Sequence, residues 1–125
     1  MKNLILFASI FLLSPVFAEE NKCNPESSVT SDMLACADEE FQKYDALLNK
    51  NYKAAMQACG DEQKCKDSLR QMQRHWIAYK EAAVEYILNY GENGGGTLGQ
   101  VQAMAWLADE TKKQAELLKE HYHAE

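Results

Sequence analysis

Apolar residues recur every three or four positions in three long stretches of the chain, the pattern of amphipathic helices that each bury one face. The three sets are Leu34, Ala37, Phe41, Tyr44, Leu48, Tyr52 and Ala55; then Leu69, Met72, Trp76, Tyr79, Ala83, Tyr86 and Tyr90; then Val101, Met104, Ala108, Thr111, Ala115, Leu118 and Tyr122. No stretch shows the alternating apolar and polar pattern of a β-strand, so the sequence predicts an all-α protein.

Polar and glycine residues mark where these helices begin and end. The first helix is predicted to continue without a break from Met33 to Ala58 and to end near Gly60, because glycine readily adopts the left-handed conformation that closes helices. The second is expected to stop at Gly91. Helix caps are expected at Thr30 or Ser31, at Asp61 and at Thr97. Short connections favour antiparallel neighbours, so we predict a small antiparallel three-helix bundle.

The first 18 residues have the features of an export signal. Lys2 is followed by a short apolar run from Leu4 to Leu13, and the segment ends on the small residue Ala18. We therefore expect a signal peptide at residues 1–18 and a single helical domain at residues 19–125. No later segment approaches the roughly 20 apolar residues of a membrane span. The periplasm is the expected location, with secretion as the alternative.

Four cysteines suit the oxidising environment outside the cytoplasm. Cys36 and Cys59 bracket the first predicted helix, and 23 residues at about 1.5 Å each place them roughly 35 Å apart. A disulfide needs Cα atoms within about 7 Å, so these two cannot bond to each other. The pairing that fits is Cys23 with Cys36 and Cys59 with Cys65, two staples at opposite ends of the helix.

The net charge limits the classes of molecule that the protein is expected to bind. The whole chain carries −6, and removal of residues 1–18 takes away Lys2 and leaves 12 basic against 19 acidic residues, a net charge of −7. Nucleic acid and anionic lipid are therefore poor partners, whereas a basic protein would be attracted. Acidity that serves solubility alone is the other interpretation.

The sequence predicts neither a metal site nor a catalytic one. Zinc sites built on cysteine usually contain close CxxC pairs, which are absent. His121 and His123 lie in the tail, where histidines are usually solvated. No GxSxG motif is present, and the acidic pairs fall on polar helix faces. We expect a protein that is not an enzyme and has no cofactor.

Polar residues inside the helical pattern form two motifs. Asp45, Asn49 and Tyr52 share one side of the first helix, and the second helix carries Gln73, Arg74 and Trp76, followed by Tyr79. We expect these residues to be structural, with Asp45, Asn49 or Gln73 satisfying Arg74 and the indole N–H across the interface. Ligand binding is the alternative.

The two motifs, together with the early cysteine pair and the Gly95-Gly96-Thr97 loop, resemble the lysozyme inhibitor LprI-like family. That family consists of small exported helical proteins named for a member that inhibits lysozyme. The resemblance implies a protein partner, with lysozyme as the leading candidate. Common lysozymes are basic and cleave in a groove flanked by carboxylates, so an acidic bundle would be steered to that groove and occlude it.

The loop at Asn93, Gly94, Gly95 and Gly96 is the candidate for direct contact with a partner. A tight turn that needs positive φ is the ordinary explanation of its glycines. Trp106 lies outside the third set of regularly spaced apolar residues. It is interpreted either as an exposed interface residue or as an extension of the core. The alternative function is a periplasmic interaction module, such as an immunity protein or an accessory subunit for another partner.

Overall fold

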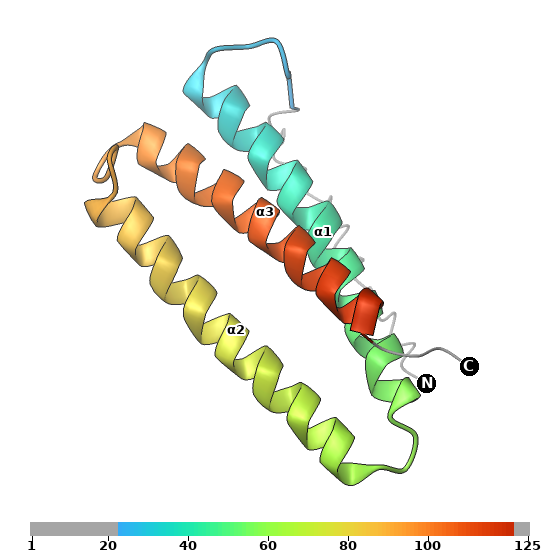
Figure 1. Cartoon of the computed structure of the whole chain (residues 1–125). Coiled ribbons are helices and arrows are strands. Elements are labelled where there is room, and N and C mark those ends of the chain that lie inside the picture. The colour runs from blue at the N-terminus through green and yellow to red at the C-terminus, as the bar shows by residue number, and fades with distance from the viewer. Residues whose placement is uncertain (1–22, 122–125) are drawn as a thin grey trace, which may run out of the picture.

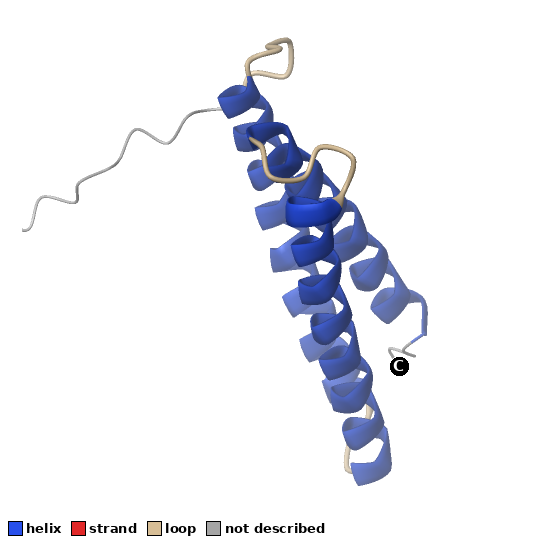
Figure 2. Ribbon diagram, turned by 90° about the vertical axis from the view of Figure 1, so that its left-hand side faces the viewer, coloured by secondary structure: helices blue, strands red, loops and turns tan. Residues whose placement is uncertain are grey.

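The computed structural model describes residues 23–121 of the protein and contains only helices and loops there (Figures 1 and 2). The helices are α1 (Thr30–Ala58), α2 (Gln63–Tyr90) and α3 (Thr97–His121). The predicted all-α fold and the unbroken first helix are confirmed. The expected signal peptide at residues 1–18 and the tail residues Tyr122 and His123 lie outside the described residues.

The helix starts differ in detail from the sequence prediction. The N-caps are Val29 for α1 and Glu62 for α2, and neither side chain caps its helix. Thr30, expected as a cap, is instead the first residue of α1, and Thr97 is the first residue of α3. At the start of α1 the polar contacts are made by Ser27, which precedes the helix. Its Oγ accepts from the Val29 N–H and donates to Asp32 Oδ2 at 2.6 Å.

Two disulfides hold the ends of α1, with the predicted pairing. Cys23 bonds to Cys36 with their Cα atoms 4.3 Å apart, and Cys59 bonds to Cys65 with a Cα separation of 5.6 Å. Gly60 lies between the second pair with φ of 57°, as expected of the residue that ends a helix. Each small ring adds on the order of 2–3 kcal/mol by restricting the unfolded chain.

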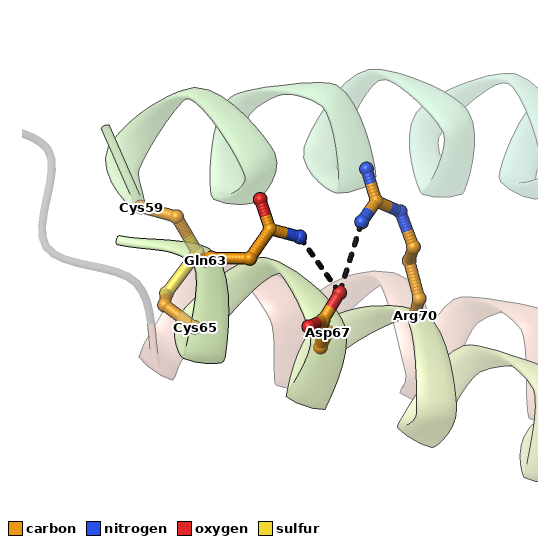
Figure 3. A network of polar contacts seen from close by, with 5 residues as sticks. All are labelled: Cys59, Gln63, Cys65, Asp67 and Arg70. Atoms are coloured by element: carbon orange, nitrogen blue, oxygen red, sulfur yellow. Dashed lines mark hydrogen bonds and ion pairs between the residues drawn. A yellow bond between two sulfur atoms is a disulfide. The ribbon is translucent and has the colours of Figure 1, made fainter. Parts of the chain in front are cut away.

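The turn between α1 and α2 is supported by the second disulfide and a small polar network on the first turns of α2 (Figure 3). Gln63 Nε2 donates to Asp67 Oδ1 at 2.9 Å, and Arg70 reaches the same oxygen at 3.2 Å. These contacts join residues three and four positions apart on an exposed helix surface, where each stabilises the helix by a few tenths of a kcal/mol. We interpret the network as structural.

The chain runs up and down, so α1 and α3 are parallel and α2 is antiparallel to both (Figure 1). α1 and α3 share the most extensive interface, α2 packs mainly on α3, and α1 touches α2 at few positions. Small residues let α1 and α3 approach closely: the buried side chains include Ala37, Ala55, Ala103, Ala108 and Ala115. The bundle is therefore a tight parallel pair with α2 added along α3.

The second apolar stripe is less buried than predicted. Trp76 is the one buried residue of α2 and joins a core cluster with Leu48 of α1 and Leu118 of α3. Tyr79, Tyr86 and Tyr90, expected on the buried face, are 56%, 62% and 75% exposed. The reason is that α2 has one close neighbour instead of two, so only a narrow strip of its surface is covered.

Candidate protein-binding surface

A buried polar layer connects the three helices. Asn51 of α1, 5% exposed, donates from Nδ2 to the backbone oxygen of Ala115 at 2.8 Å. One residue earlier on α3, Gln114 donates from Nε2 to Gln73 Oε1 of α2 at 3.1 Å. Within residues 23–121 no buried side-chain nitrogen or oxygen lacks a hydrogen-bond partner. Because each bond needs one particular alignment of two helices, the layer sets the register of the bundle.

The motif residues contribute to this layer less than the sequence suggested. Of the expected partners of Arg74, Gln73 instead bonds to Gln114, and Asn49 is exposed, as is Arg74 itself. Asp45 is half-buried, and Tyr52 packs against the core cluster. The sequence pattern missed Asn51, since it lies beside the apolar stripe of α1 and only the approach of α3 buries it.

The loop between α2 and α3 folds back on the end of α2. The Gly95 N–H donates to the Leu88 oxygen at 2.7 Å, with Gly95 at φ of 83°. A Cβ on Gly94 would lie 2.7 Å from the carbonyl carbon of Asn89, so the close approach of two backbones requires glycine there. The turn geometry thus explains these two glycines. Residues 94–96 are nevertheless exposed, while Asn93 is half-buried.

Gly94→Ala should lower the free energy of unfolding by about 1–3 kcal/mol, because the added methyl group would overlap the backbone of α2. Gly96→Ala is the matched control, since its Cβ would find its nearest neighbour, the Asn93 oxygen, at 3.9 Å. Urea unfolding followed by circular dichroism measures both. Equal stability of the two variants would contradict this account of the loop.

Charge is divided unevenly between the two halves of the bundle. The half that contains the glycine loop, here called the loop half, comprises residues 23–45 and 76–108 and carries nine carboxylates and two lysines, a net charge of −7. The remaining described residues, 46–75 and 109–121, form the turn half, with seven carboxylates and nine lysines or arginines, a net charge of +2. The excess negative charge of the described chain therefore lies entirely in the loop half.

Exposed apolar side chains gather in the same half. Six of the eight large exposed apolar side chains of the described chain belong to it, and the three most exposed are Tyr90, Tyr86 and Val29. Tyr79 packs edge-on against the half-buried Trp106 with ring centroids 5.9 Å apart, so this tryptophan extends the edge of the core. Tyrosine and tryptophan are enriched where proteins bind proteins.

Comparison with known proteins identifies the family. Residues 22–118 match the family described as "Lysozyme inhibitor LprI", which covers almost all of the described chain. The chain belongs to the LprI family. It is also similar to an uncharacterised protein of Rhizobium meliloti (strain 1021), with 31% identity over 119 residues, covering 86% of this chain and 84% of that protein. No solved structure matches the chain significantly.

Within the described part of the chain, no group of three or more histidine, cysteine or acidic side chains is arranged to hold a metal ion. Hydrogen bonds to Asp109, and secondarily to Glu110, raise the pKa of the Lys113 ammonium on the exposed face of α3. That contact is an ordinary helix-surface ion pair in the turn half.

The family also bears on location and partner. An inhibitor of lysozyme acts on another protein, and two disulfides are typical of proteins outside the cytoplasm. Among residues 23–121 no helix combines the length and the apolar character needed to cross a membrane. The family and the disulfides together agree with a protein located outside the cytoplasm.

Proposed function

We propose that this LprI-family protein is exported to the periplasm, is not an enzyme, and inhibits lysozyme by covering its substrate groove. The observation that carries the proposal is the match to the lysozyme inhibitor family over residues 22–118. The two disulfides support export, because such bonds persist in oxidising compartments.

The proposed mechanism is steric and electrostatic occlusion through the loop half. Its net charge of −7 would draw a basic lysozyme toward this end and disfavour approach of the turn half, which carries +2. The exposed tyrosines provide apolar contact area, and the segment from Asn93 to Gly96 lies at the same end of the bundle. We propose that this loop contributes to the contact. The mature protein then competes with the polysaccharide substrate for the groove.

The mature protein should abolish the activity of chicken-type lysozyme stoichiometrically. Raising the salt from about 0.1 M to about 1 M should weaken inhibition, because the screening length falls from about 10 Å to about 3 Å. Turbidity loss of a bacterial cell-wall suspension measures the activity. Goose-type and invertebrate-type enzymes are tested in parallel, and full activity of all three at micromolar excess of the protein would reject the proposal.

The contribution of the loop is tested by adding one positive charge to it. Gly96→Arg is expected to weaken inhibition several-fold, since Gly96 is exposed and its surroundings leave space for a side chain. Gln57→Arg makes the same charge change at an exposed position of α1 in the turn half and should have little effect. Equal inhibition by both variants would remove the loop from the contact while leaving inhibition itself intact.

A further inference from the structure

An open groove lies along the second half of α2, between α2 and α3. It has a volume of about 440 Å³ and an apolar floor formed by Val84 and Leu88 of α2 and Leu107 of α3, all half-buried. Glu81 and Glu85 line the same groove and are exposed. These two residues are four positions apart, so their carboxylates are neighbours on one side of α2. The groove thus combines an apolar surface with two neighbouring carboxylates.

The positive groups nearby leave these two carboxylates available. Lys80 also lines the groove, but its Nζ lies 4.8 Å from the centroid of the Trp76 ring. Among residues 23–121 the ion pairs join Arg70 to Asp67 and Lys113 to Asp109 and Glu110, so none involves Glu81 or Glu85. A cation supplied from outside would therefore meet two unpaired carboxylates.

We propose that this groove is the docking site for an arginine or lysine side chain of a basic partner protein. The inference rests on the proposed function and adds a second contact region of the loop half to the glycine loop. Arginine and lysine have an apolar stem and a cationic end, so the stem would lie on the floor at Val84, Leu88 and Leu107 while the charge meets Glu81 and Glu85. A guanidinium group has several donors in a plane and can bond to both carboxylates.

The charge of the surrounding surface also favours a basic side chain as the occupant of the groove. The loop half has a net charge of −7, so an acidic segment or a second copy presenting its own loop half would be repelled. A purely apolar side chain would fill the floor but leave both carboxylates unused. A basic side chain is complementary to both features of the groove.

The test uses the full mature protein with the double variant Glu81→Gln/Glu85→Gln, which keeps the size of both side chains. The matched control is Glu116→Gln/Glu120→Gln, because these residues are also exposed, also four apart on one helix, and lie in the turn half. Calorimetry with chicken-type lysozyme should show affinity about 10-fold lower for the groove variant and nearly unchanged for the control. Equal affinities would overturn the proposed site while leaving inhibition standing.

A second experiment tests the groove without lysozyme. An acetylated and amidated tri-arginine peptide is titrated into the ¹⁵N-labelled protein, and backbone amide shifts are expected around residues 81–88 and at Leu107, with loss in the Glu81→Gln/Glu85→Gln variant. This result would support the groove even if no lysozyme is inhibited. Shifts confined to other surfaces would overturn it. The proposal would also be overturned if sedimentation showed that the wild-type protein is a dimer and the Glu81→Gln/Glu85→Gln variant a monomer. A second copy of the chain would then occupy the groove.

Discussion

Asn51→Asp should destabilise the protein by about 3 kcal/mol or more at pH 7, the largest effect we expect from a change of so few atoms. The Asn51 amide donates to the Ala115 oxygen at 2.8 Å in a site that is only 5% exposed. A carboxylate there would lose the donor, face a carbonyl oxygen and carry an unpaired charge into the α1–α3 interface. Urea unfolding at pH 7 gives the free energy difference.

The same variant should recover as the pH falls. Burial disfavours the charged form, so the pKa of the new carboxyl in the folded state is raised above its unfolded value of about 3.9. The proton is then bound more tightly by the folded state, and stability is lost as pH rises from about 4 through the raised pKa. Below that window the protonated acid can donate to the Ala115 oxygen. The difference in the free energy of unfolding between the Asn51→Asp variant and the wild-type protein is therefore measured at pH 4 and at pH 7.

Asn49→Asp is the control, because Asn49 is exposed two residues earlier on the same helix. It makes the same chemical change and should alter the free energy of unfolding by less than about 0.5 kcal/mol. If both aspartates had equal effects at pH 7, the polar layer would not hold α1 against α3 as described.

Trp76→Ala should remove about 3–5 kcal/mol from the free energy of unfolding, enough to leave a domain of this size marginally folded. The indole is 8% exposed and packs in the cluster that contains Leu48, Ala115 and Leu118. Its loss would leave a cavity where the three helices meet. Guanidinium unfolding with the disulfides intact, followed by far-ultraviolet circular dichroism, measures the change.

Tyr79→Ala provides the comparison. Tyr79 belongs to the same apolar stripe but is 56% exposed, and its ring packs edge-on against the ring of Trp106. We expect a loss of about 0.5–1.5 kcal/mol from that aromatic pair. A loss as large as that of Trp76→Ala would mean that α2 packs more deeply against the other helices than the structure shows.

The sequence by itself determined the local structure and the covalent links of this protein. Apolar spacing of three and four predicts each helix because side chains at those intervals share one face. The length of α1 then separates Cys36 from Cys59 and leaves the pairing that the structure shows. The motifs likewise indicated the LprI family that the match over residues 22–118 identifies.

Only the tertiary structure decided which parts of each helix are covered. Asn51 and Asn49 differ little in sequence context, yet α3 buries one and leaves the other in water. The stripe of α2 contains both Trp76 and Tyr79, but α2 has a single close neighbour, so the tyrosine stays exposed. Periodicity states which residues of one helix lie together, whereas burial depends on how closely other helices approach. The charged loop half and the groove at Glu81 and Glu85 arise from that placement, which brings together residues far apart in the chain.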